Sequence, residues 1–88
     1  MYRVELTKQV RRFLDKKTNK FVKKVFQNFK LLSESPYRNN LDIKPIKGQR
    51  GLWRLRIGTI RFIYSIKKKQ SVILILKADS RGQVYKKK

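Results

Sequence analysis

The run Val72–Leu76 is the feature that most restricts how this chain can fold. Its five consecutive aliphatic residues stand in a chain of 88 residues in which 34% are charged. Five residues are far fewer than the roughly 20 that a membrane-spanning helix needs. Because the run is apolar on both of its faces, it predicts a central strand that is covered on two sides.

The length and composition predict a single domain over residues 1–88. A chain this short buries only about 60% of its unfolded surface, so its core must be compact. The hydrophobic share is 40%, and the chain has no Cys, so no disulfide and no Cys-ligated zinc can support the fold. The N-terminus lacks the apolar region of a signal peptide, and we expect a cytoplasmic protein.

The first part of the chain predicts a strand followed by a helical hairpin. Tyr2–Leu6 alternates apolar and polar side chains, as a half-buried strand does. Thr7 can cap a first helix, and Thr18 or Asn19 can cap a second. The second helix should end before Pro36, because proline disfavours helical conformation in the residue that precedes it.

From Leu41 onward the pattern becomes strand-like, with short connections that contain glycine or lysine. Gly58-Thr59 predicts a two-residue type II′ hairpin turn, since glycine accepts the positive φ of its first central position. The whole predicts an α+β fold in the order β-α-α-β-β-β-β, with the N-terminal strand and helical hairpin packed on a mainly antiparallel twisted sheet. Gln83–Lys88 should in part be a tail. The four later strands are expected at residues 41–46, 52–57, 60–67 and 70–77.

The charge balance points to a polyanionic partner. Twenty-five Lys and Arg stand against five Asp and Glu, for a formal net charge of +20. Such a chain repels itself unless a polyanion or an acidic protein compensates. The basic residues are spread along the chain with no long basic amphipathic helix, which favours nucleic acid over a membrane surface.

Three arginines are expected on one face of the sheet. Alternation in the 52–57 strand puts Arg54 and Arg56 on the face opposite Trp53, about 6 to 7 Å apart. Arg61, in the next strand, can join them on a face that also carries Ile63. We therefore expect a concave floor with apolar patches between cations, which can bind phosphates. The alternative is a merely solubilising face, as charged strand faces commonly are, but the shortage of acidic partners weakens it.

Arg81 and Tyr85 follow the last predicted strand. On their own they indicate an ordinary basic tail. Together with the arginine face they can contribute a guanidinium for a phosphate and a phenol that stacks on an unpaired base.

The missing residue types restrict the chemistry. There is no His, and the five acids are scattered along the sequence, which gives no basis for an imidazole acid–base pair or a two-metal nuclease site. Catalysis without a metal or cofactor is feasible on RNA, because the 2′-hydroxyl is a nucleophile beside the scissile phosphate. Arginines can then stabilise the charge of the transition state, and a lysine or tyrosine can transfer protons.

Three segments resemble the RelE/ParE toxin superfamily, and its RelE-like messenger-RNA interferases in particular: Leu52–Arg56, Gly58–Tyr64 and Arg81–Tyr85. The resemblance covers essentially the whole chain. It implies that Arg54 and Arg56 orient RNA and assist proton abstraction, that Arg61 stabilises the transition-state phosphate, and that Arg81 is a general acid or phosphate ligand. It also implies that Tyr85 stacks on a base. Since arginine stays protonated, Tyr85 is the better candidate for the general base.

The resemblance further implies a type II toxin that cuts mRNA in the ribosomal A site and is silenced by an acidic RelB-like antitoxin in a hetero-oligomer. Opposite charges would speed the association of that antitoxin with this basic chain. Two alternatives stay open: a ParE-like inhibitor of DNA gyrase, and a non-catalytic basic protein that binds RNA or the ribosome.

Overall fold

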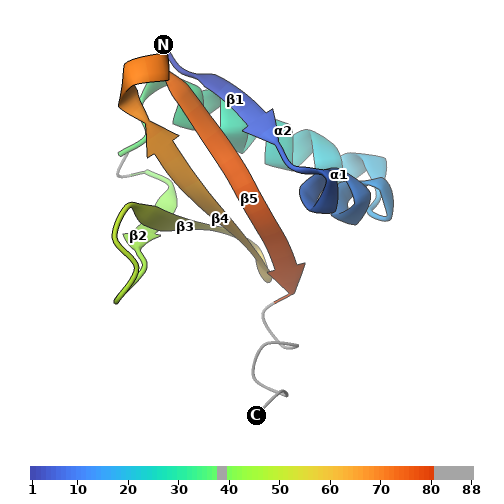
Figure 1. The fold of residues 1–88 in the computed structure, drawn as a ribbon. Helices are drawn as coiled ribbons and strands as arrows, with labels where there is room; N and C mark the ends of the chain where they lie inside the picture. Colours follow the sequence, from blue (N-terminus) through green and yellow to red (C-terminus); the bar gives the residue numbers. More distant parts are fainter. Residues whose placement is uncertain (38–39, 81–88) are drawn as a thin grey trace.

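The computed structural model describes residues 1–37 and 40–80 as an α+β fold in which two α-helices accompany a five-stranded sheet (Figure 1). The order β-α-α-β-β-β-β is confirmed. The elements are β1 (Arg3–Leu6), α1 (Lys8–Asp15), α2 (Asn19–Glu34), β2 (Asp42–Pro45), β3 (Leu52–Ile57), β4 (Ile60–Lys67), the 3-10 helix η1 (Lys68–Gln70) and β5 (Val72–Ser80).

Both helices begin at threonine caps. The Thr7 hydroxyl accepts a hydrogen bond from the Val10 amide at 3.4 Å, and the Thr18 hydroxyl accepts one from the Phe21 amide at 3.1 Å. Each cap satisfies an amide that the first helical turn leaves without a partner. Thr18, rather than Asn19, is therefore the second cap, and α2 ends ahead of Pro36 as the sequence predicts.

The sheet has the strand order β1-β5-β4-β3-β2. Strands β2 to β5 pair with their sequence neighbours in antiparallel fashion, whereas β1 pairs in parallel with β5 at one edge. Strand β2 is shorter than the expected 41–46, and β5 runs to Ser80 instead of ending at Lys77. The sheet is mainly antiparallel, as expected.

The β3–β4 turn has the predicted geometry. Ile57 pairs with Ile60, so the loop consists of Gly58 and Thr59 alone. Gly58 has a φ of +62°, and Thr59 is not among the described residues with positive φ. Positive φ at the first central position alone distinguishes type II′ from type I′.

One face of the sheet carries the core. Apolar side chains from both helices form a single cluster with strand residues of one phase, among them the fully buried Phe62 and Tyr64. The Tyr64 hydroxyl donates to the Pro36 carbonyl at 3.0 Å, and burial, with a smaller effect of Tyr37, raises the pKa of this phenol above its ordinary value. Tyr64 is thus a core residue, as its phase with Phe62 predicts.

The prediction for Val72–Leu76 needs a correction. Strand β5 does lie inside the sheet, between β1 and β4. Ile73 and Ile75 are fully buried, but Leu74 and Leu76 on the opposite face are only half-buried. Helical side chains cover one face only, so these leucines form part of an accessible apolar floor on the other.

Candidate functional site

The sheet face opposite the helical layer, called here the outer face, carries most of the charged strand residues in two cross-strand rows. In the first row, Arg56 and Arg61 are direct neighbours on β3 and β4, with an aspartate at each end. In the second, Arg54 and Ile63 lie between two lysines. The rows are Asp42–Arg56–Arg61–Asp79 and Lys44–Arg54–Ile63–Lys77.

Three of the five predicted site residues therefore come together: Arg54, Arg56 and Arg61. Their catalytic roles stay predictions. Arg81 and Tyr85 lie outside the described residues. Strand register is what unites the three arginines, since Arg61 faces Arg56 across the two-residue turn.

Two aspartates hold these arginines, although the acids look scattered along the sequence and neither aspartate was predicted to do so. Arg54 Nη2 donates to Asp42 Oδ1 at 3.2 Å, and Arg56 Nε donates to Asp42 Oδ2 at 3.0 Å. Arg61 Nε lies 3.5 Å from Asp79 Oδ1. The shortage of acids is real for the chain as a whole, but not for this face. The sequence did not reveal this pairing because it depends on strand register. The connection between β2 and β3 is long, so the sequence did not fix how Asp42 aligns with β3.

The two arginines that pair with Asp42 also set the protonation state of this carboxyl. Burial alone would raise the pKa of this carboxyl, but the hydrogen bonds and positive charges of Arg56 and Arg54 outweigh it and hold the pKa below its ordinary value. Asp42 thus stays ionised at neutral pH. It keeps two guanidinium groups side by side despite their mutual repulsion.

The arginines differ in how deeply they are held. The exposed fraction of the side chain is 14% for Arg54, 25% for Arg61 and 41% for Arg56. Arg54 Nη1 is buried and has no hydrogen-bond partner within the described part of the chain, whereas the buried Arg61 Nε faces the buried Asp79 Oδ1 in their ion pair at 3.5 Å. A buried charged donor without a partner costs about 1–3 kcal/mol or more. The exposed parts of the Arg54 and Arg61 side chains can donate to an anionic ligand.

A pocket of about 570 Å³, the arginine pocket, lies beside these donors. Its cations are Arg54, Arg61, Lys44 and Lys77, and its floor includes Leu52, Ile63 and Leu76. A β-bulge at Ile63/Tyr64 lets β5 present both Leu76 and Lys77 to this pocket, because Ile63 pairs with Lys77 and Tyr64 with Ile75. The predicted concave floor with apolar patches between cations is present.

The ionisable residues that line the arginine pocket are all cationic. Guanidinium groups keep their protons, so neither arginine can act as a general base. Neither of the pocket lysines, Lys44 and Lys77, was predicted from the sequence. The pocket can bind a phosphate and stabilise added negative charge, but its arginines cannot supply a base.

The described residues provide neither a cluster of metal ligands nor a membrane-spanning helix. Among residues 1–37 and 40–80, no group of three or more Asp and Glu side chains could hold a metal ion. Neither of the described helices is long and apolar enough to cross a membrane.

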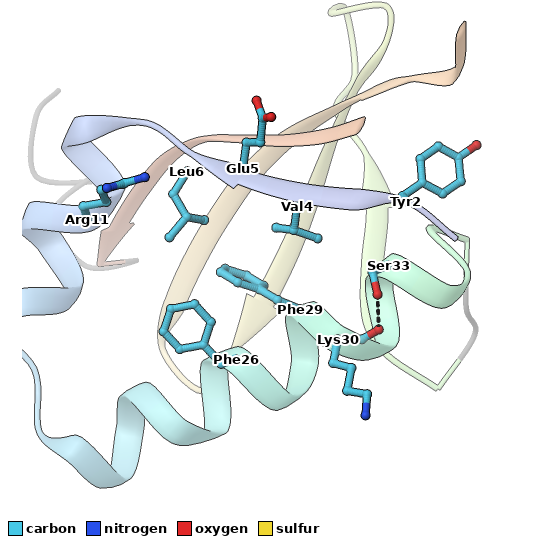
Figure 2. Close-up of a pocket in the computed structure, with 9 residues that line it drawn as sticks. All are labelled: Tyr2, Val4, Glu5, Leu6, Arg11, Phe26, Phe29, Lys30 and Ser33. Atoms are coloured by element: carbon cyan, nitrogen blue, oxygen red, sulfur yellow. Dashed lines mark hydrogen bonds between the residues drawn. The ribbon is translucent and has the colours of Figure 1, made fainter. Parts of the chain in front are cut away.

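A larger hollow of about 640 Å³, the β1–α2 groove, lies on the helical side of the sheet. Figure 2 shows Val4 and Leu6 of β1 pointing towards Phe26 and Phe29 of α2. Phe26 has 47% of its surface exposed and meets the ring of Phe29 edge-on at 5.7 Å between centroids. The groove combines these apolar side chains with charged ones, Glu5, Arg11 and Lys30, and a mixed surface of this kind is suited to packing against another chain.

Known proteins share this fold and sequence pattern. Residues 4–85 match the family model described as "ParE toxin of type II toxin-antitoxin system, parDE". A chain of the archaeal RelE–RelB complex from Pyrococcus horikoshii OT3 is 33% identical, with a TM-score of 0.81 over 93% of this chain and 97% of that one. A chain of the RelBE2 toxin–antitoxin complex from Mycobacterium tuberculosis is 31% identical, with a TM-score of 0.74 over 91% and 98%.

The E. coli RelBE toxin–antitoxin complex contains a chain with the same fold at only 11% identity, with a TM-score of 0.77 over 91% of this chain and 96% of that one. No curated protein matches the sequence. The family match and the two more similar structures each cover nearly the whole chain. The chain therefore belongs to the RelE/ParE superfamily and is a toxin of a type II toxin–antitoxin system.

Proposed function

We propose that this toxin is a cytoplasmic, ribosome-dependent endoribonuclease that inhibits translation by cutting mRNA in the A site without a metal. The observation that carries the proposal is the arginine pocket, in which Arg54 and Arg61, each held by an aspartate, lie together with Lys44 and Lys77. The similarity to RelE chains of solved complexes supports it.

The reaction proposed for this pocket uses the RNA's own nucleophile. The 2′-oxygen attacks the neighbouring phosphorus, the bond to the 5′-oxygen breaks, and the products carry a 2′,3′-cyclic phosphate and a 5′-hydroxyl. Arg54 and Arg61 stabilise the extra negative charge on the phosphate as it becomes pentacoordinate. The 2′-proton passes to a base, for which Tyr85 is the candidate, and the leaving 5′-oxygen receives a proton from a general acid, for which Arg81 is the candidate.

Cleavage of mRNA by purified toxin on translating ribosomes tests the proposal. Arg61→Ala should lower the single-turnover cleavage rate by about 100-fold, as expected for losing a donor to a transition-state oxyanion. Arg12→Ala is the matched control, because Arg12 is an exposed arginine on α1, remote in sequence from the outer face. An uncut message, or equal rates for the two variants, would contradict the proposal.

A second target has a specific observation in its favour, because the matching family model is described as a ParE toxin. The alternative is therefore inhibition of DNA gyrase with no cleavage of RNA. A supercoiling assay separates the two functions: inhibition of gyrase together with intact mRNA would favour the ParE-like activity. The cationic lining of the arginine pocket favours the nuclease.

We also propose an acidic antitoxin as the partner, since similar chains occur in RelE–RelB and RelBE2 complexes. A net charge of +20 favours a negatively charged chain. Strand β1 lies at the edge of the sheet. The Arg3 amide donates to the Ser71 carbonyl, and the Thr7 amide, just after the strand, donates to the Ile75 carbonyl. The backbone groups of the alternate residues Val4 and Leu6 therefore point away from β5.

The β1–α2 groove next to that edge can take apolar side chains of the antitoxin (Figure 2). Phe26→Glu should weaken the complex with the cognate acidic antitoxin, whereas Phe26→Leu should largely keep it. Unchanged affinity of the Glu variant, measured by isothermal titration calorimetry, would remove the groove from the interface.

A further inference from the structure

A third hollow, the Trp53 pocket, lies on the other side of β3 from the arginine pocket. It has a volume of about 520 Å³ and is lined by Tyr37, Trp53, Ile66 and the segment Lys67–Gln70. The rings of Tyr37 and Trp53 meet edge-on, with 5.4 Å between their centroids, and Tyr37 has 46% of its surface exposed. Two aromatic rings therefore stand beside a run of three lysines.

The turn between β4 and β5 holds these lysines in place. It contains η1 and ends at Ser71, which adopts the left-handed conformation (φ 56°, ψ 47°). The Ser71 amide donates to the Lys68 carbonyl at 3.2 Å, and the Ser71 carbonyl accepts from the Arg3 amide at 2.8 Å. Because the turn is tied to β1, its three positive charges are kept close together despite their repulsion.

No acid relieves that repulsion locally. Lys67, Lys68 and Lys69 are exposed, and none of them takes part in an ion pair with another described residue. This contrasts with Arg54, Arg56 and Arg61, which each have an aspartate. An exposed cluster of this kind can bind polyanions through several phosphates at once.

Another hollow of about 500 Å³ lies around the β2–β3 connection. It shares Pro45, Ile46, Gln49 and Leu52 with the arginine pocket, and Gly51 and Trp53 with the Trp53 pocket. The linings of all three hollows contain no Asp or Glu, and the middle one adds Arg50. The linings of the three hollows thus overlap from the outer face to the aromatic pair, and the charged residues of this surface are cationic, although Asp42 and Asp79 pair with Arg54 and Arg61 beside it.

We propose that this surface is a track for single-stranded RNA, in which the Trp53 pocket takes a nucleotide that flanks the one bound in the arginine pocket. The flanking base stacks against the exposed parts of Tyr37 and Trp53, and Lys67–Lys69 bind its neighbouring phosphates. Aromatic rings next to a basic groove are the means by which proteins bind single strands without reading their sequence. The inference rests on the proposed function only in placing the reacting phosphate in the arginine pocket.

Trp53 is the only tryptophan of the chain, so its fluorescence reports on this pocket directly. The full-length protein is titrated with two single-stranded RNAs, a trinucleotide and a nonanucleotide, both 2′-O-methylated to prevent cleavage. The longer RNA should quench Trp53 and bind more tightly, because only it reaches both pockets. Tyr37→Ala should reduce the affinity for the nonanucleotide several-fold and leave the trinucleotide unaffected.

Removal of the lysine charges gives the main test. Lys67→Gln/Lys68→Gln/Lys69→Gln should weaken nonanucleotide binding about 10-fold and reduce the slope of log K against log salt by about 0.7 for each phosphate that is no longer bound. The matched control is Lys16→Gln/Lys20→Gln/Lys23→Gln, which removes the same charge from exposed positions in the helical part of the chain. Circular dichroism shows whether both variants are folded.

Each outcome is informative. Equal losses for the two triple variants would mean that only net charge matters, and would overturn the track. Absence of quenching by RNA, or equal quenching by an acidic peptide or by anionic vesicles, would overturn the base-stacking site. Failure of mRNA cleavage with these binding results intact would refute the proposed nuclease and leave the track standing.

Discussion

The two cationic regions of this toxin are built differently. In the arginine pocket, Arg54 and Arg61 are mostly buried and each has an aspartate neighbour. At the β4–β5 turn, Lys67–Lys69 are exposed and pair with no acid among the described residues. The first arrangement fixes the positions of donors, and the second concentrates charge. We infer that the arginines act on a transition state and that the lysines contribute affinity.

The chemistry of the two side chains supports this difference. A guanidinium is a planar fork whose direction can be fixed, whereas an ammonium on a flexible stem acts as a point charge. Catalysis needs groups that interact more strongly with the transition state than with the substrate, and fixed donors meet that need. Binding of a passing strand needs only a high local potential.

The largest expected effect is on cleavage by Arg54 variants. Arg54→Ala should lower the single-turnover rate of mRNA cleavage by about 100-fold, because it removes a buried, pre-positioned donor. Lys68→Ala, the counterpart at the turn, should change the rate at saturating ribosomes by less than about threefold, since it alters ground-state binding only.

Arg54→Lys sharpens the same contrast, because it keeps the charge but loses the fork. Its rate should lie much closer to that of Arg54→Ala than to wild type. Near-wild-type cleavage by the Arg54→Lys protein would show that charge alone suffices, and the distinction between the two regions would then fail.

Much of this fold followed from local patterns. Thr7 has the position of a helix cap, and Gly58 has the conformational freedom that its turn requires. The later strands show clear alternation of apolar and polar residues. The same alternation in the sequence was enough to place Arg54 and Arg56 on one face. Local pattern could not reveal the register between neighbouring strands. The pairing of Asp42 with Arg56 and of Asp79 with Arg61 was therefore missed.

The prediction that both faces of β5 are covered was wrong for a related reason. An apolar run in the sequence does not show whether another layer packs on each of its faces. Leu76 of β5 forms part of the floor of the arginine pocket and is not covered by a second layer. The bulge beside Ile63, which presents Leu76 and Lys77 together, is a property of two paired strands and not of either sequence. Arg81 and Tyr85 lie outside the described residues, and their roles stay predictions.

A smaller effect is expected from Asp42→Ala, which releases Arg54 and Arg56 from their shared carboxylate. The variant should lose about 1 kcal/mol of the free energy of unfolding in urea, because the partly buried Arg54 is left with fewer partners. Its affinity for single-stranded RNA should rise, because one negative charge leaves the outer face. Lys68→Ala should do the opposite, with stability within about 0.5 kcal/mol of wild type and weaker binding.

Stability and RNA affinity should therefore change in opposite directions at Asp42. Chemical denaturation and fluorescence anisotropy on the same preparations measure both. An Asp42→Ala protein that is as stable as wild type would show that the aspartate does not hold the arginines. One that binds RNA less well would show that it positions them for the ligand.

The smallest effect is the pH dependence that Asp42 contributes. Its hydrogen bonds with Arg56 and Arg54 lower its pKa in the folded protein, whereas in the unfolded chain the pKa is near 3.9. The stabilisation is therefore fully present above the unfolded pKa and is lost as the pH falls through the folded pKa. Asp42→Asn lacks this contribution, so the difference in unfolding free energy between wild type and the variant should shrink by about a few tenths of a kcal/mol below about pH 4.

Arg56 supplies the strongest of the interactions that lower this pKa, so Arg56→Gln should remove most of that pH-dependent difference. Urea denaturation of the four proteins of this double-mutant cycle between about pH 3 and pH 7 measures it. The effect must be small because 40% of the Asp42 side chain is exposed and water screens its charge. A difference that persists unchanged in the Arg56→Gln background would mean that Arg54 alone holds the carboxylate, and the row Asp42–Arg56–Arg61–Asp79 would then not act as one unit.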